Sequence, residues 1–220
     1  MEGPRESKSS TDERQNTFLK PNYFVTIQIT DKETLKNLQA EQKDFLSRYP
    51  RYKDSVIPQE RFHVTLTVLE LPDEDHIKEC IATLENVKDD IIDLARKAGK
   101  LTFRGLGSFS TRVIFAKLEF SNEFMQLVDL IRNSIAVTGI KVELKPLKAH
   151  VTLFKVKSDT YKEMGIYMYK GKLILASLFD PDPYFGSQDI NNVQICEISG
   201  DREDNGFYRN IFNLSIDHSK

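Results

Sequence analysis

Alternation of apolar and polar residues, with many β-branched and aromatic side chains, marks the expected strands of this chain. Strands are predicted at Tyr23–Thr30, Phe62–Leu71, Leu101–Arg104, Val113–Leu118, His150–Val156, Val193–Ile198 and Phe207–Leu214. The glycine-bearing stretch Gly105–Phe109 is expected to be a loop between two of these strands, and Asp204–Gly206 a turn.

Apolar residues at helical spacing predict the helices. They are expected from a cap at Thr30 or Asp31 to about Arg48, after the acidic start Asp73–Asp75 through Leu84, over Asp89–Ala98, and from a cap at Ser121 to Gly139. A helical turn is expected near Pro183–Phe185.

The order strand, helix, histidine-bearing strand occurs twice along the chain. Because no Pro/Gly/Ser-rich linker separates the two occurrences, we expect an internal duplication within one bilobal domain, residues 19–220, and not two linked domains. Residues 1–18 are rich in Ser, Glu, Arg and Lys and are expected to form a disordered tail.

Composition narrows the class of protein. The chain has 220 residues, 40% of them hydrophobic, and a net charge of −2, which argues against a long nucleic-acid duplex as the main partner. Cys80 and Cys196 are expected to be buried free thiols, since they are too few for a disulfide framework. Without an apolar run of the ~18 residues that a membrane span needs, or a signal peptide, we expect a monomeric cytoplasmic or nuclear protein that contacts no membrane.

Two of the four histidines occur in the same context. Residues 61–67 read RFHVTLT and residues 148–154 read KAHVTLF. Alternation along a strand places His63, Thr65 and Thr67 on one face, and it places His150, Thr152 and Phe154 together in the same way. If the two strands are neighbours, two imidazoles and two hydroxyls face one cleft with approximate two-fold symmetry.

This combination suits phosphoryl transfer without a metal ion or other cofactor. One neutral imidazole can accept a proton from an attacking hydroxyl, while the other, protonated, donates one to the leaving oxygen. Thr65 and Thr152 would bond the non-bridging phosphate oxygens.

Two other interpretations remain open from the residues alone. Each histidine could be an ordinary core or edge residue, as in most strands. A zinc site is the rival chemistry, but no carboxylate or cysteine lies at ligand spacing, and His76 and His218 are expected to be exposed to solvent.

The paired HVTL motifs, with the segments YFVTIQIT, LTFRGLGSF, VIFAKLE and DNGFYRNIFNLSI, resemble the 2H phosphoesterase superfamily, and within it the branch that contains the A-kinase anchoring protein 18 central domain. The resemblance covers about residues 21–215. It implies an α+β, two-lobed LigT-like fold, with duplicated antiparallel sheets flanked by helices around a central cleft. It also implies that His63, Thr65, His150 and Thr152 are the catalytic residues.

Members of this superfamily cleave 2′,5′-oligoadenylates, process RNA 3′ ends or open cyclic phosphates. The expected function is therefore a metal-independent phosphodiesterase acting on a short RNA or a 2′,5′-oligoadenylate. The alternative is a module that binds AMP or another mononucleotide in the same cleft without turnover, and a weaker third is a protein-interaction domain. The helix by which kinase-anchoring members bind their partner is not expected in this chain.

Lysines and aromatic residues suggest where a nucleotide would bind. Between Lys141 and Lys172 there are eight lysines and three acids, a positive region around the second motif that would favour phosphate. The aromatic candidates for stacking on a base are Phe109, Phe154 and Tyr184. Core packing is the competing role for each of them.

Overall fold

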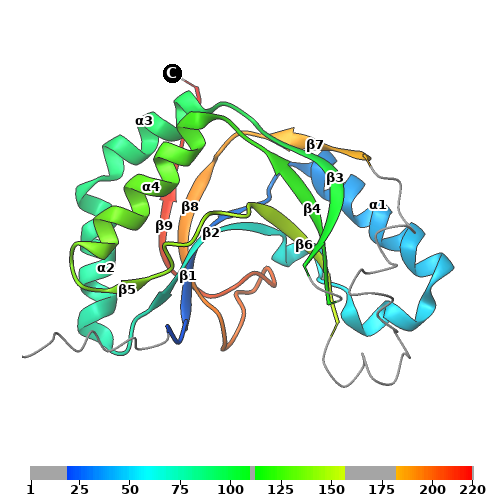
Figure 1. The fold of residues 1–220 in the computed structure, drawn as a ribbon, viewed down its shortest axis with the longest axis horizontal. Coiled ribbons are helices and arrows are strands. Elements are labelled where there is room, and N and C mark those ends of the chain that lie inside the picture. The colour runs from blue at the N-terminus through cyan, green and yellow to red at the C-terminus, as the bar shows by residue number, and fades with distance from the viewer. Residues whose placement is uncertain (1–18, 110–111, 157–181, 220) are drawn as a thin grey trace, which may run out of the picture.

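The computed structural model describes residues 19–109, 112–156 and 182–219. They form one continuous sheet, antiparallel at every pairing of its strands, with helices on its outer sides (Figure 1). The expected tail, residues 1–18, lies outside the described residues. Within the described ranges, no helix has the length and apolar character required to cross a membrane.

The chain forms strands, helices and 3-10 turns close to the predicted positions. The strands are β1 (Tyr23–Gln28), β2 (His63–Glu70), β3 (Leu101–Phe109), β4 (Val113–Glu119), β5 (Lys141–Val142), β6 (His150–Lys155), β7 (Tyr184–Gln188), β8 (Asn192–Glu197) and β9 (Asn210–Ser215). The helices are α1 (Lys32–Arg48), α2 (Glu74–Asn86), α3 (Lys88–Ala98) and α4 (Asn122–Ala136), with 3-10 turns η1 (Pro50–Ser55) and η2 (Gln59–Arg61).

Three helices begin at the predicted caps. The Asp31 carboxylate accepts a hydrogen bond from the Thr34 amide at 2.7 Å, and Asp73 accepts from the amides of Asp75 and His76. The Ser121 hydroxyl accepts from the Phe124 amide at 3.3 Å. Each cap satisfies backbone donors that the first helical turn leaves unpaired.

The strand order shows the expected duplication. It runs β7-β3-β4-β6-β2-β1-β8-β9, so that β6 and β2 form the centre and each half places three further strands beside its histidine strand. The halves meet through one residue pair, Val64 with Val151. Helix α1 covers the lobe with β3, β4, β6 and β7, whereas α2, α3 and α4 cover the lobe with β1, β2, β8 and β9 (Figure 1). The two-lobed α+β fold is therefore confirmed.

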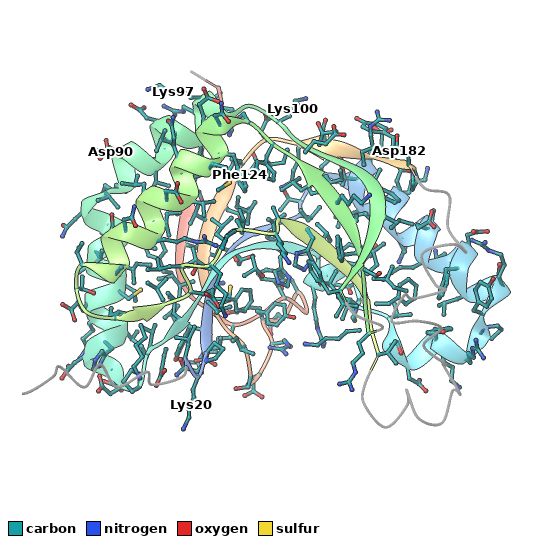
Figure 2. The ribbon with its side chains drawn as sticks, viewed as in Figure 1. Lys20, Asp90, Lys97, Lys100, Phe124 and Asp182 are labelled. Carbon is teal, nitrogen blue, oxygen red and sulfur yellow. The ribbon has the colours of Figure 1, made fainter. Side chains whose placement is uncertain are left out.

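Both lobes bury apolar side chains between helices and sheet. Phe124 of α4 is fully buried, whereas Asp90 and Lys97 stay exposed on α3 (Figure 2). Both cysteines, Cys80 and Cys196, are buried free thiols as predicted.

The glycine-bearing stretch was wrongly predicted as a loop, since β3 continues through it to Phe109. Gly105 has a φ of 76°, a backbone conformation that side-chain-bearing residues rarely adopt, at a point where the pairing of β3 with β4 shifts register. A Cβ on Gly107 would lie 2.6 Å from the Phe115 ring. These glycines therefore permit a bulge and a close ring contact within a strand.

Two other predicted boundaries differ. Residues near Pro183–Phe185 form the start of strand β7 and not a helical turn, because β7 pairs with β3 through Phe103 and Gly186. Strand β9 begins at Asn210, three residues after the predicted start at Phe207, because Phe207 and Tyr208 belong to the β8–β9 connection.

A buried glutamine joins α1 to the end of β6. The Gln42 amide nitrogen donates to the carbonyls of Ile57 and Leu153, both at 2.8 Å. The same two residues are joined by a backbone bond from the Ile57 amide to the Leu153 carbonyl at 2.9 Å. Gln42 therefore fixes the η1–η2 connection against the sheet.

We predict that Gln42→Leu lowers the free energy of unfolding by about 1–3 kcal/mol, because two buried carbonyls lose a donor. Urea unfolding monitored by circular dichroism measures the change. Gln39→Leu is the matched control, since Gln39 is partly exposed and its side chain forms no hydrogen bond with the described residues. Equal stability of Gln42→Leu and the parent would contradict the prediction.

Candidate functional site

The candidate site lies where the two lobes meet. Antiparallel pairing of Val64 with Val151 places His63 opposite Thr152 and Thr65 opposite His150. The two valines are fully buried on one face of the sheet. On the other face lie four partly exposed side chains, His63, Thr65, His150 and Thr152. The structure thus brings together the four residues that the repeated motif singles out, as two pairs related by approximate two-fold symmetry.

Both imidazoles are oriented by the backbone in the same way. His63 Nδ1 lies 2.7 Å from the Arg61 carbonyl, and His150 Nδ1 lies 2.6 Å from the Lys148 carbonyl. Because a carbonyl only accepts, Nδ1 carries the proton in each ring. In the neutral form, Nε2 on the opposite side of each ring is then a proton acceptor.

Burial favours the neutral form of both rings. It lowers the pKa of His63 to about 4, because burial outweighs the bond to the Arg61 carbonyl, and the nearby His150 lowers it further. Burial also lowers the pKa of His150, against the opposing effect of its bond to the Lys148 carbonyl. An anion bound between the rings would favour the protonated form and raise both pKa values.

Aromatic rings from the neighbouring strand β1 and from the β8–β9 connection lie against His63. The Phe24 ring lies 5.1 Å from the imidazole centroid, and Tyr208 meets it edge to face at 5.2 Å. Arg202 stacks on Tyr208, with its guanidinium 4.4 Å from the ring centroid. These three residues were not predicted as site residues. The segment NGFYRN, which contains Tyr208 after a turn-forming Asn-Gly, is the one signal that could have indicated them.

His150 has a matching environment. Phe109 meets its ring edge to face at 4.8 Å, and Phe115 lies 5.0 Å from it. The Lys148 ammonium is 5.8 Å from the Phe109 centroid. Each histidine therefore contacts an aromatic ring that carries a cation, Tyr208 with Arg202 and Phe109 with Lys148. Phe109 lies where a substrate-binding aromatic was predicted.

Phe154 and Tyr184 lie elsewhere. Phe154 is fully buried, and its ring centroid is 4.9 Å from that of Phe45 in α1, so core packing describes it. Tyr184 stacks with Arg104 at the sheet edge, on a strand three positions from β6, or roughly 14 Å at the usual strand spacing. Neither side chain is positioned to contact a base in the cleft.

A bulge accounts for the burial of Phe154. In β6 one extra residue lies between Thr152, which pairs with Phe115, and Phe154, which pairs with Ile114. The same irregularity follows Thr65 in β2, where Thr65 and Thr67 pair with the consecutive residues Thr26 and Val25. Thr67, predicted to share the face of His63, is accordingly buried and donates to the Glu143 carbonyl at 2.9 Å. Strict alternation therefore fails immediately after each His-x-Thr motif.

A cavity of about 610 Å³ opens beside His150 and Thr65. Its wall includes Phe109 and Lys148, and the buried Arg132 lies at its base. The guanidinium of Arg132 donates to the Leu66 and Lys145 carbonyls, and burial lowers its pKa. Arg132 thus ties the segment before β6 to β2, which shapes the cavity.

The predicted positive region is only partly available to a ligand. Lys141 pairs with Glu70 at 3.4 Å, and Lys145 pairs with Glu143 at 3.3 Å. Lys148 and Lys155 have no such pairing in the described part of the chain, and the lysines from residue 157 on lie outside it.

The remaining histidines lie away from the motifs. The imidazole of His76 bonds to the Asp73 carboxylate at 2.7 Å, which raises the pKa of His76. His218 Nε2 lies 3.1 Å from the Ile190 carbonyl. The His76 side chain is 42% exposed, in agreement with the prediction, whereas His218 is partly buried and was predicted to be exposed. Among the described residues, no group of three His, Cys, Asp or Glu side chains could hold a metal ion.

Comparison with known proteins identifies the family. Residues 21–216 match the family described as the AKAP7 2′5′ RNA ligase-like domain. Human A-kinase anchor protein 7 isoform gamma is 28% identical over an alignment of 201 positions, and the alignment covers 86% of this chain and 55% of that protein. The chain thus spans about half the length of this relative.

Solved structures show the same fold. E. coli LigT, complexed with 3′-AMP, superposes with a TM-score of 0.55 at 16% identity, covering 90% of this chain and 99% of LigT. The MHV ns2 PDE domain gives a TM-score of 0.51 at 12% identity, covering 81% of this chain and 100% of that domain. With two His-x-Thr motifs at the junction of a duplicated sheet, the chain belongs to the AKAP7 2′5′ RNA ligase-like domain family, within the 2H phosphoesterase superfamily.

Proposed function

We propose that this protein is a metal-independent phosphodiesterase that cleaves a short RNA or a 2′,5′-oligoadenylate by acid–base catalysis with His63 and His150. The observation that carries the proposal is the symmetric orientation of the two imidazoles, each with Nδ1 donating to a backbone carbonyl and Nε2 free to exchange a proton. A phosphodiester between them would meet one proton acceptor and one proton donor. Thr65 and Thr152 would donate to its non-bridging oxygens.

The solved relatives support a nucleotide as the ligand. Structures of E. coli LigT hold 3′-AMP, ATP, phosphate and NADP+. In this chain, Phe109 with Lys148 beside the His150 cavity offers a stacking surface and a cation for a base and its phosphate.

The two histidines are suited to different roles. His63, whose pKa is lowered to about 4, keeps its neutral form more readily and suits the base. His150 is proposed as the acid. In this arrangement His63 takes the proton of a hydroxyl beside the scissile phosphate, and that oxygen attacks phosphorus in line. His150 protonates the departing oxygen, leaving a cyclic phosphate.

The second candidate is a module that binds a mononucleotide without turnover. The lowered pKa of both histidines favours it, because a pair of neutral rings lacks the acid until a bound phosphate raises one pKa. The two candidates therefore differ in whether a bound phosphate raises the pKa of His150 enough for the ring to act as an acid. Measurements of cleavage in solution distinguish them.

His63→Ala and His150→Ala are each expected to reduce kcat/KM for a cleaved dinucleotide by roughly 100-fold or more, the usual effect of losing a general acid or base. Chromatography of the products measures the loss of cleavage.

Cleavage by the parent protein should persist in excess EDTA, because both proton carriers are side chains. The same chromatography measures this effect. Activity that EDTA abolishes and a divalent cation restores would contradict the mechanism, and unchanged melting temperatures would exclude unfolding of the variants.

The pH dependence should follow from the lowered pKa values. Catalysis needs one ring neutral and one protonated, so kcat/KM is expected to peak below pH 6.5, where the free protein still holds one proton on the pair. The rate should then fall about tenfold per pH unit towards alkaline pH, as that proton is lost. If His63 is the base, the pH profile of His63→Ala should no longer fall at acidic pH, because no base remains to be protonated. The pH profile of His150→Ala should no longer fall at alkaline pH, because no acid remains to lose its proton. An optimum above pH 7.5 would be incompatible with this assignment.

The first product is expected to carry a cyclic phosphate, since a neighbouring hydroxyl held by the ribose reacts more readily than water. Mass spectrometry of early time points distinguishes the cyclic product from a linear one. The control is a deoxy analogue that lacks the vicinal hydroxyl and should resist cleavage. Equal cleavage of this analogue would identify water as the nucleophile.

A further inference from the structure

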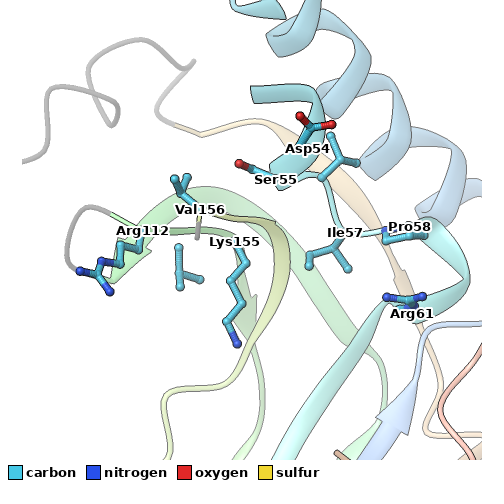
Figure 3. A pocket seen from close by; sticks show the side chains of 10 residues that line it. Asp54, Ser55, Ile57, Pro58, Arg61, Arg112, Lys155 and Val156 are labelled. Carbon is cyan, nitrogen blue, oxygen red and sulfur yellow. The ribbon is translucent and has the colours of Figure 1, made fainter. Parts of the chain in front are cut away.

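A second pocket lies beside the segments that carry His63 and Thr152, because two of its lining residues are Arg61, two residues before His63, and Lys155, three residues after Thr152 (Figure 3). It has a volume of about 700 Å³, within the range of small-molecule sites. Three cationic residues, Arg61, Arg112 and Lys155, and one acid, Asp54, line it. None of the described residues that line it is aromatic, in contrast to the cavity beside His150.

The walls of this pocket are held by hydrogen bonds within the fold. The segment between η1 and η2 pairs with β6 through Val56 and Phe154, and the Ile57 amide donates to the Leu153 carbonyl. On the opposite side, the Val156 amide donates to the Arg112 carbonyl at 2.8 Å. The pocket is therefore formed before any ligand binds.

Two of the cations connect the pocket to the catalytic motifs. Arg61 is the residue whose carbonyl orients His63. Lys155 follows Thr152 by three residues, or roughly 10 Å along a strand. The bulge in β6 buries Phe154 and returns Lys155 to the exposed face of the strand, where it lines the pocket (Figure 3).

One of the residues that line the pocket has an unused donor. The Nε atom of Arg61 is buried and has no hydrogen-bond partner among the described residues. Neither Arg61 nor Lys155 forms an ion pair in that part of the chain. A buried donor without a partner is unfavourable, and an anionic ligand would satisfy it with a charge-assisted bond.

We propose that this pocket binds a second phosphate group of the substrate, the one next along the nucleotide chain from the phosphate held between the histidines. The inference rests on the proposed function. Cations without an aromatic surface suit a phosphate and not a base, whereas Phe109 and Lys148 at the opposite end suit a base. A dinucleotide with one additional terminal phosphate can therefore occupy the cleft and this pocket together.

The test compares a cleaved dinucleotide with the same dinucleotide carrying an additional phosphate at its 5′ or its 3′ end. For the parent protein, one of the two phosphorylated forms is expected to have a kcat/KM about tenfold higher than the plain dinucleotide, a factor that corresponds to about 1.4 kcal/mol. In Lys155→Gln and in Arg61→Gln this ratio should fall towards one. Lys97→Gln, on the exposed side of α3, is the charge-matched control and should keep the parent ratio.

Salt dependence gives a second readout that a merely structural effect would not produce. In a plot of the logarithm of the affinity for the phosphorylated dinucleotide against the logarithm of the salt concentration, Lys155→Gln and Arg61→Gln should each have a slope smaller in magnitude than the parent by about 0.7. A parent ratio near one for both phosphorylated forms, or a ratio that neither variant changes, would overturn the inference.

Failure of the proposed function is distinguishable from failure of this inference. If the protein cleaves no dinucleotide, the same ligands are compared by their dissociation constants in isothermal titration calorimetry. If the parent protein binds a phosphorylated form more tightly and Lys155→Gln removes this difference, the pocket binds phosphate in a protein that binds nucleotides without cleaving them. Equal dissociation constants overturn it.

Discussion

The pairing of Val64 with Val151 is the contact on which the candidate site depends. It is the point where β2 meets β6, and the lobes diverge from it on either side. Because side chains alternate along a strand, a slip of one residue would move one histidine to the core face. The complete burial of both valines opposes such a slip. One register therefore determines the distance between the imidazoles, their shared face and the hydroxyl opposite each of them.

Features that depend on the local pattern of residues could be predicted from the sequence. The alternation in His63-Val64-Thr65 and its repeat at residue 150 predicted a shared face, and Asp31, Asp73 and Ser121 predicted where helices begin. That the two histidine strands are neighbours was a condition of this interpretation, which the pairing of Val64 with Val151 meets.

Features that depend on distant partners were not predictable in the same way. A bulge in β6 turns Phe154 towards the core, where its ring packs against Phe45 of α1. The alternation of apolar and polar residues does not indicate where a bulge occurs. Tyr208 and Arg202 reach His63 from a connection near the end of the chain. The carbonyls of Arg61 and Lys148 orient the rings, and since every residue has a carbonyl, no side chain reveals this role.

The two histidines contact matching aromatic rings, but the pockets near them differ, which affects the direction in which a nucleotide chain would bind. A pair of imidazoles related by two-fold symmetry offers the same chemistry to a phosphodiester in either direction. A nucleotide chain, however, has distinct 5′ and 3′ ends. With an aromatic cavity beside His150 and a cationic pocket beyond His63, the two directions of threading become energetically different. Under the proposed function, the duplicated strands would provide the two proton carriers, and the two unlike pockets would set the direction in which the nucleotide chain binds.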